Sequence, residues 1–248
     1  MRPVRATERI DDHVVWHDLE CGRYAEDLPL WRELAAHQAG PVLDVGAGSG
    51  RVALDLARHG HEVTALDCDE LLIGELARRA GSLPVRALTA DARAFSLEER
   101  FGLCLAPMQT VQLLGGPPGR LAFLRCARRC LRPGGRLAAA IVEQVECYEE
   151  QEGVPGPLPD VLERDGTLYF SQPTAVRRRP EGFVLERRRE RIDTRGGRAV
   201  EENRITIDLL SAEVLEAEAL CAGLTPAGRV EIASTDEHVG SMVVMLDA

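Results

Sequence analysis

The sequence predicts an α/β fold in which a doubly wound, mostly parallel sheet forms the core. Apolar runs of strand length alternate with helix-length segments from residue 41 to about 142, which is typical of βαβ units around a parallel sheet. A glycine-rich turn at residues 46–50 follows the first strand and precedes a helix, as at the ligand-binding edge of open α/β sheets. A chain of 248 residues is long enough for one such domain with an inserted segment.

The elements of this region follow one another in regular order. We expect strands at residues 41–45, 62–66, 84–88, 101–106 and 136–142, and helices at residues 50–59, 70–80 and 119–131. The turn Arg132-Pro133-Gly134-Gly135 ends the last helix, because proline cannot continue a helix and glycine permits a tight reversal.

The alternation of strands and helices stops after residue 142. A proline- and glycine-rich linker at residues 153–159 precedes four strand-like segments at residues 167–171, 174–179, 183–192 and 200–209. Ser211 then caps a helix that runs to about residue 222, and strands at 225–232 and 241–246 follow. We therefore expect a helical cap segment at 1–40, a core at 41–143 and 210–248, and an antiparallel β insertion at 144–209.

Charge and apolar content limit the classes of partner. The chain has 30 arginines, no lysine and 40 acidic residues, which give a net charge of −10. Because an acidic chain repels the phosphate backbone, we expect no nucleic-acid partner. No stretch approaches the ~18–20 uninterrupted apolar residues that a membrane helix needs. Residues 1–12 lack the apolar core of a signal peptide. These observations favour a cytoplasmic protein without membrane association.

The sequence does not predict a metal site. The seven cysteines contain no Cys-x-x-Cys pair, and no histidine lies near Cys126 and Cys130 to complete a zinc site. His13, His17 and Glu20 have the spacing of ligands on one helical face, but we interpret this pattern as an exposed helix face.

Acidic residues surround the turn at 46–50 in a pattern that indicates a nucleoside ligand. Asp44 precedes the first glycine, Asp67 ends the second strand and Asp91 follows the third strand. A carboxylate at the end of the second strand can accept hydrogen bonds from both ribose hydroxyls. Each acid taken alone could instead cap a helix or face solvent. The dinucleotide fingerprint Gly-x-Gly-x-x-Gly is incomplete, since Arg51 stands in place of its third glycine.

These features resemble class I S-adenosylmethionine-dependent methyltransferases. The residues that carry the resemblance are 42–50 for the first motif, Asp67 for the ribose-binding acid, Asp91-Ala92 for the adenine-binding pair and 131–135 for the turn before the fifth strand. The resemblance implies a Rossmann-like sheet of seven strands with an antiparallel last strand. Gly102 departs from the family, which commonly has an acid directly after the aromatic residue that opens the fourth strand.

The resemblance implies S-adenosylmethionine as the cofactor and S-adenosylhomocysteine as the product. The implied cofactor-binding residues are Tyr24, Asp44, Gly46, Ala47, Gly48, Gly50, Asp67, Cys68, Asp91, Ala92, Ala106 and Met108. Asp44 would lie near the methionine amino group of the cofactor. Tyr24 would close the pocket as an aromatic side chain from the segment before the first strand.

The methyl acceptor is expected to be a small molecule that reacts through nitrogen or oxygen without a metal. The run Ala106-Pro107-Met108-Gln109 lacks the Asn/Asp-Pro-Pro-aromatic turn of nucleobase methyltransferases, and residues 103–112 contain no acid that could hold magnesium. The insertion at 144–209 resembles the lid of small-molecule methyltransferases such as glycine N-methyltransferase, and it could instead supply a homodimer surface. Gln109, Gln112 and Glu143 are the candidates for facing the acceptor.

Two other functions stay open at this point. One is an NAD(P)-dependent oxidoreductase, which Arg51 and Asp44 make less favourable and for which the chain shows no Tyr-x-x-x-Lys motif. The other is a regulatory protein that binds the cofactor without turnover.

Overall fold

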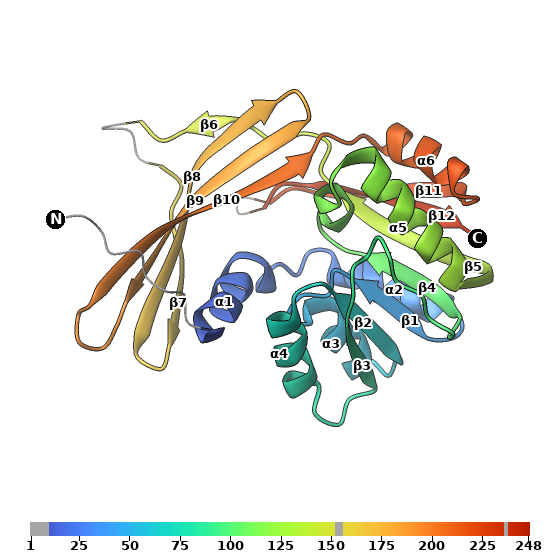
Figure 1. Ribbon diagram of the computed structural model, residues 1–248, viewed down its shortest axis with the longest axis horizontal. Coiled ribbons are helices and arrows are strands. Elements are labelled where there is room, and N and C mark those ends of the chain that lie inside the picture. The colour runs from blue at the N-terminus through green and yellow to red at the C-terminus, as the bar shows by residue number, and fades with distance from the viewer. Residues whose placement is uncertain (1–9, 152–155, 236–237) are drawn as a thin grey trace. The chain divides into compact units, whose positions relative to one another are not determined.

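The computed structural model describes residues 10–151, 156–235 and 238–248 (Figure 1). The chain divides into two compact units, one made of residues up to 23 with 145–207, and one made of residues 24–144 with 208–248. The N-terminal 40 residues, predicted as one cap segment, are therefore split at Tyr24. Two sequence predictions fall partly outside the described residues. One is the absence of a signal-peptide core at 1–12, of which residues 1–9 are not described. The other is the linker at 153–159, of which residues 153–155 are not described.

The larger unit contains the predicted seven-stranded sheet. Its strand order is β11-β12-β5-β4-β1-β2-β3. The strands are β1 Val42–Val45, β2 Val63–Asp67, β3 Val85–Thr89, β4 Phe101–Ala106, β5 Leu131–Ile141, β11 Thr225–Ile232 and β12 Ser241–Asp247. The first five strands pair in parallel, and β12 runs antiparallel to both β5 and β11. The predicted fold class is confirmed.

Helices cover both faces of this sheet. They are α2 Leu28–His37, α3 Arg51–Arg58, α4 Glu70–Ala80, α5 Gly116–Cys130 and α6 Ala212–Cys221. One apolar core joins α5 and α6 to one face, and a second joins α2, α3 and α4 to the other. Leu103 and Cys104, adjacent on β4, belong to different cores. Burial on both faces explains why these strands are continuous apolar runs in the sequence.

Two boundaries in the core differ from the sequence prediction. Helix α5 begins at Gly116, three residues before the expected position, and its first turn contains Pro117 and Pro118. Proline fits there because the first N–H groups of a helix have no intrahelical partner. Strand β5 begins at Leu131, which pairs with Phe101, so the predicted turn at 132–135 lies within the strand.

The smaller unit is an antiparallel sheet with the order β10-β9-β8-β6, in which β7 also pairs with β8. Its strands are β6 Tyr148–Glu149, β7 Asp160–Arg164, β8 Thr167–Arg179, β9 Gly182–Ile192 and β10 Arg198–Asp208. The two strands predicted at 167–171 and 174–179 form the single strand β8, which has an irregularity between Pro173 and Ala175. The sequence did not predict β6 or β7.

Helix α1 Ile10–His17 and the π-helical turn η1 Asp18–Gly22 pack on this antiparallel sheet. The Trp16 ring meets the Tyr169 ring edge-on at 5.1 Å between centroids, and the Tyr169 hydroxyl donates to Asp12 over 2.7 Å. Arg189 donates to both carboxylate oxygens of Glu20, so this carboxylate is committed to an ion pair. Among the described residues there is no group of three or more side chains arranged to hold a metal ion.

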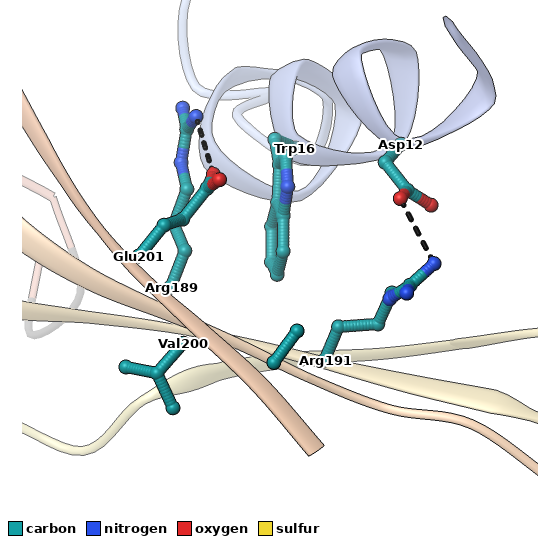
Figure 2. A pocket seen from close by; sticks show the side chains of 7 residues that line it. Asp12, Trp16, Arg189, Arg191, Val200 and Glu201 are labelled. Atoms are coloured by element: carbon teal, nitrogen blue, oxygen red, sulfur yellow. Dashed lines mark hydrogen bonds and ion pairs between the residues drawn. The ribbon is translucent and has the colours of Figure 1, made fainter. Parts of the chain in front are cut away.

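Figure 2 shows the interior between this helix and the strands. Asp12 and Trp16 project from α1 toward Arg189 and Arg191, and Asp12 pairs with Arg191 at 3.1 Å. The cavity that they line holds about 20 Å³, which is room for roughly one water molecule. It is too small for an organic acceptor.

No helix in the described part of the chain is both long and apolar enough to cross a membrane.

Gly102, the departure from the family pattern, has a structural reason. A Cβ atom at this position would lie 2.0 Å from the Ala39 carbonyl oxygen. The Gly102 N–H also donates to the Pro41 carbonyl over 3.1 Å. The segment before β1 therefore occupies the space in which an acidic side chain would begin.

We expect Gly102→Ala to lower the free energy of unfolding by about 1–3 kcal/mol, the usual range for overpacking. Urea unfolding followed by circular dichroism measures this change. Gly74→Ala is the matched control, because a Cβ at this helical position meets nothing within 4 Å. The control should gain about 0.5–1 kcal/mol from helix propensity. Wild-type stability of the Gly102 variant would show that the close approach is absent.

Candidate functional site

The glycine turn between β1 and α3 is shaped by its neighbours. Gly46 and Gly50 have φ values of 75° and 100°, which glycine adopts without strain. A Cβ at Gly46 would lie 2.5 Å from the Thr110 hydroxyl oxygen, and one at Gly50 would lie 2.8 Å from Leu76. The turn therefore has no room for a methyl group at either end.

Asp67 lies beside this turn, as the sequence predicts. One of its carboxylate oxygens accepts a hydrogen bond from the Gly48 N–H at 2.9 Å, and the other accepts from the Asp69 N–H at 3.0 Å. Cys68 follows directly and is exposed, and partial burial beside the Asp67 charge raises the pKa of its thiol. The end of β2 and the glycine turn thus form one continuous edge.

Asp44 is completely buried at the end of β1. Neither carboxylate oxygen has a hydrogen-bond partner of acceptable geometry among the described residues. Burial raises the pKa of Asp44 to about 7, while the Arg51 charge and the Ala53 N–H oppose this rise and the Asp67 charge adds to it. A buried carboxylate without a partner is costly, so this site favours a proton or a cationic group beside Asp44.

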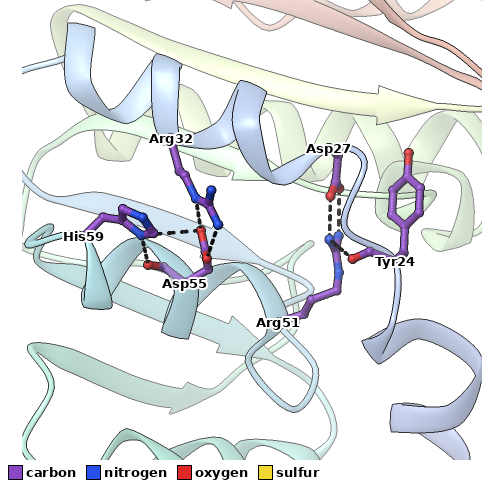
Figure 3. Close-up of polar contacts among 6 residues, drawn as sticks. All are labelled: Tyr24, Asp27, Arg32, Arg51, Asp55 and His59. Carbon is purple, nitrogen blue, oxygen red and sulfur yellow. Dashed lines mark hydrogen bonds and ion pairs between the residues drawn. The ribbon is translucent and has the colours of Figure 1, made fainter.

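Arg51 anchors the N-terminal segment to the start of α3 (Figure 3). Its guanidinium donates to both oxygens of Asp27 at 2.5 and 2.7 Å, and to the Tyr24 carbonyl at 2.8 Å. The side chains of this ion pair are only 9% and 1% exposed. Sequence reasoning missed Asp27, since nothing in its spacing from Arg51 indicates a contact. The residue that replaces the third fingerprint glycine is committed to a buried ion pair.

Tyr24 lies at the carboxyl edge of the core sheet. Its ring is 5.0 Å from the His238 ring, in the connection between β11 and β12. The Tyr24 hydroxyl also interacts with Ser241, the first residue of β12, and burial raises the pKa of Tyr24. Ser241 follows that connection next to Met242, which pairs with Ile141 near the carboxyl end of β5. The predicted closing aromatic therefore stands between the glycine turn and the β11–β12 connection.

Asp91 and Ala92 follow β3. The Asp91 carboxylate is bound by the Arg93 side chain at 2.7–3.1 Å and by the Arg93 N–H at 2.8 Å. These bonds lower the pKa of Asp91 to about 2 and keep it ionised. An adenine amino group at this position would have to share the carboxylate with Arg93.

The segment after β4 turns sharply beside the glycine turn. Ala106 is fully buried, and Met108 has a φ of 53°, a left-handed conformation that is uncommon for a methionine. This turn leads to the 3-10 helix η2 Thr110–Leu113. Ala106 and Met108 are therefore on the same edge as the turn and Asp67.

Two of the three acceptor candidates make hydrogen bonds to the backbone of the core. Gln112 is completely buried, and its amide bonds to Val142 and Asp208 backbone groups. Glu143 accepts from the Ala212 N–H at 2.7 Å and so caps α6 together with Ser211. Position at the carboxyl end of a strand does not reveal side-chain direction, and this is why both were predicted to face an acceptor. Gln109, partly exposed before η2, stays a candidate.

Comparison with known proteins shows a similarity over the part of the chain that contains this edge. A family model described as a methyltransferase domain matches residues 42–135. The chain contains a methyltransferase domain. The matched residues run from the start of β1 into the first half of β5, and they include the glycine turn, Asp67 and Asp91. The predicted family is confirmed for this domain.

Curated relatives match a part of the chain of similar length. The ubiquinone biosynthesis O-methyltransferase of Xanthomonas oryzae is 35% identical over 104 residues, which cover 39% of this chain and 40% of that protein. The enzyme of the same name from Pseudomonas putida is 30% identical over 112 residues, covering 43% of this chain and 47% of that protein. The chain thus matches less than half the length of these relatives.

Solved structures match nearly the whole chain. DesVI of Streptomyces venezuelae has a TM-score of 0.71 at 18% identity, covering 96% of this chain and 98% of that chain. The CcbJ methyltransferase of Streptomyces caelestis has a TM-score of 0.65 at 24% identity, covering 91% and 96%. At these identities the likeness establishes the fold, which is that of class I S-adenosylmethionine-dependent methyltransferases.

We expect the stability of the methyltransferase domain without ligand to depend on pH through Asp44. Its pKa in the folded state, about 7, lies above its usual value of 3.8, so the folded state holds a proton that the unfolded state has lost. The free energy of unfolding should therefore fall as the pH rises from about 4 to 7 and stay low above that. Asp44→Asn removes this loss, which amounts to at most about 4 kcal/mol at pH 8.

Urea unfolding of both proteins at pH 5, 6, 7 and 8 measures the difference. Asp165→Asn, the same change in an exposed turn, should keep the wild-type pH dependence. Parallel pH profiles for wild type and Asp44→Asn would contradict the assignment of a buried, proton-binding carboxylate.

Proposed function

We propose that this protein is a methyltransferase that uses S-adenosylmethionine to methylate a small molecule on nitrogen or oxygen, without a metal ion. The observation that carries the proposal is Asp44, a buried carboxylate without a partner beside the glycine turn of a methyltransferase domain. The methionine part of S-adenosylmethionine carries an ammonium group, which is the kind of cation that this carboxylate lacks.

The residues along the same edge fit the rest of the cofactor. Asp67 presents an ionisable carboxylate next to the Gly48 N–H, as a ribose diol requires. Asp91 offers acceptor oxygens for an adenine amino group, and Tyr24 can cover the methionine side. The glycopeptide N-methyltransferase MtfA, with the same fold at 20% identity and a TM-score of 0.61, has been solved with S-adenosylmethionine.

In the reaction, S-adenosylmethionine supplies a methyl group activated by a positively charged sulfur. The task of the protein is then to hold the nucleophile in line and to exclude water. Asp44 and Asp67 would fix the methionine and ribose parts of the cofactor. Gln109, after the sharp turn at Met108, is the remaining side chain that we assign to the acceptor side.

As the methyl acceptor, an amine on a small polar molecule agrees better with the similarities of this chain than a ubiquinone precursor does. The ubiquinone relatives named above match 39–43% of the chain. The sugar N-methyltransferase KedS8 covers 98% of the chain at a TM-score of 0.69, and the amino pentose methyltransferase CalS10 covers 96% at 0.66. Their likeness extends over the antiparallel insertion, which we propose as the acceptor-binding element.

The other two functions have less support. The proteins named above are methyltransferases and give no support to an NAD(P)-dependent oxidoreductase, and Arg51 fills the position of the third fingerprint glycine with a buried ion pair. A silent regulatory protein would bind the cofactor and release no product. Cytoplasmic location and a homodimer stay predictions.

The decisive experiment combines binding and turnover. Thermal shift with S-adenosylmethionine, S-adenosylhomocysteine and NADPH should show stabilisation by the first two alone, because a ligand of the folded state stabilises by mass action. Release of S-adenosylhomocysteine with a panel of amino sugars, phenols and carboxylic acids then tests turnover. Stabilisation by NADPH alone would overturn the proposal. Cofactor binding without turnover across the panel would favour the regulatory protein.

We expect Asp67→Ala to weaken binding of S-adenosylmethionine by about 2–3 kcal/mol, the scale of charge-assisted hydrogen bonds. S-adenosylhomocysteine should lose the same amount, because the two molecules share the ribose. Isothermal titration calorimetry measures both affinities. Asp165→Asn serves again as the control with unchanged affinity, and an unchanged dissociation constant for Asp67→Ala would remove Asp67 from the site.

A further inference from the structure

Gln112 connects two chain segments that are far apart in the sequence. Its Nε2 donates to the Val142 carbonyl at 3.0 Å and to the Asp208 carbonyl at 2.8 Å, and its Oε1 accepts from the Val142 N–H at 2.7 Å. Val142 is among the last core residues before the insertion at 145–207, and Asp208 is the first core residue after it. One buried amide therefore holds both ends of the insertion.

Other polar contacts fix the same two points. The Asp208 carboxylate accepts from the Gly116 N–H at 2.7 Å and from Arg120 at 2.8 Å. Arg120 is 2% exposed and also binds Glu218 on α6 at 2.7 Å through two nitrogens. Glu143 bonds to the first residue of α6. The exit and the return of the insertion are thus tied to η2, α5 and α6.

Helix η2, which contains Gln112, also lies against the glycine turn at residues 46–50 through its first residue, Thr110. Thr110 fills the space that a side chain at Gly46 would need, with its oxygen and Cγ2 at 2.5 and 2.6 Å from the position of that Cβ. The Thr110 hydroxyl donates to the Pro107 carbonyl at 2.8 Å. Helix η2 spans four residues, so Thr110 beside the glycine turn and Gln112 are only two residues apart.

Apolar packing alone would hold these segments together. Ile141, Leu210 and Ala212 are already buried in the core that α5 and α6 share. A buried amide adds a requirement that apolar contacts lack, because its donors and acceptor must all be satisfied in one arrangement. Gln112 therefore selects a single register between the end of β5 and the returning chain.

We propose that Gln112 is a positioning residue that couples occupancy of the cofactor site to the two ends of the insertion through η2. The inference rests on the proposed function, since it takes S-adenosylhomocysteine as a ligand of this edge. Binding at the glycine turn restrains Thr110, and Gln112 transmits this restraint to Val142 and Asp208.

Hydrogen–deuterium exchange with and without saturating S-adenosylhomocysteine tests the coupling. In the wild-type protein the ligand should slow exchange of the peptides that contain residues 141–144 and 208–212 by at least about fivefold, the lower range of typical coupling between sites. In Gln112→Met this protection should disappear, while calorimetry shows an affinity for the ligand within about twofold of wild type. A residue with a purely structural role would not change the ligand-dependent part of the exchange.

Two further variants keep the test decisive. Gln144→Met, the same change at an exposed glutamine near the junction, should keep the wild-type protection. Thr110→Ala removes the contact at the other end of η2 and should also abolish protection, and it answers the question if Gln112→Met does not fold. Protection that survives in the Gln112 or Thr110 variant overturns the inference. Absence of binding to the wild-type protein overturns the proposed function, and with it this inference.

Discussion

The close packing of the glycine turn determines how the rest of the candidate site is arranged. Gly46 lies against Thr110 and Gly50 against Leu76, with no space for a methyl group at either position. The turn is thus fixed by protein contacts from η2 and α4. The Gly48 N–H of the turn donates to Asp67, and Asp44 is buried near the end of the preceding strand, so one tight fit places both carboxylates that we propose bind the cofactor.

Arginine side chains hold together core segments that are distant in the sequence. Every basic residue of the chain is arginine, and several bind a carboxylate through two nitrogens at once, as Arg51 does with Asp27 and Arg120 with Glu218. A guanidinium makes such forked pairs, whereas a lysine ammonium acts as a single point of charge. Both of these pairs are largely buried, and each joins segments remote in sequence. The arginine-rich composition therefore contributes directly to how the core is held.

Much of the fold could be predicted from the sequence, because the strands of the core are local apolar runs and the turns contain their own glycines and prolines. The cluster of Asp44, Asp67 and the glycine turn was predictable too, since carboxyl ends of parallel strands share an edge. Contacts that depend on tertiary structure were not. Nothing local shows that Asp27 meets Arg51, that Ala39 excludes a side chain at Gly102, or that Gln112 points inward to the backbone.

The division of the chain at Tyr24 has a consequence for folding during synthesis. Trp16 and Leu19 bury themselves against Tyr169, about 150 residues later in the chain. At typical ribosomal speeds of about 5–20 residues per second, they wait roughly 8–30 s for that partner. The last parallel core strand, β5, ends at Ile141, 28 residues before Tyr169, and is therefore made about 1–6 s earlier. During this wait a nascent chain carries an aromatic helix without its partner strand, while α6, β11 and β12 of the core are also still to be made.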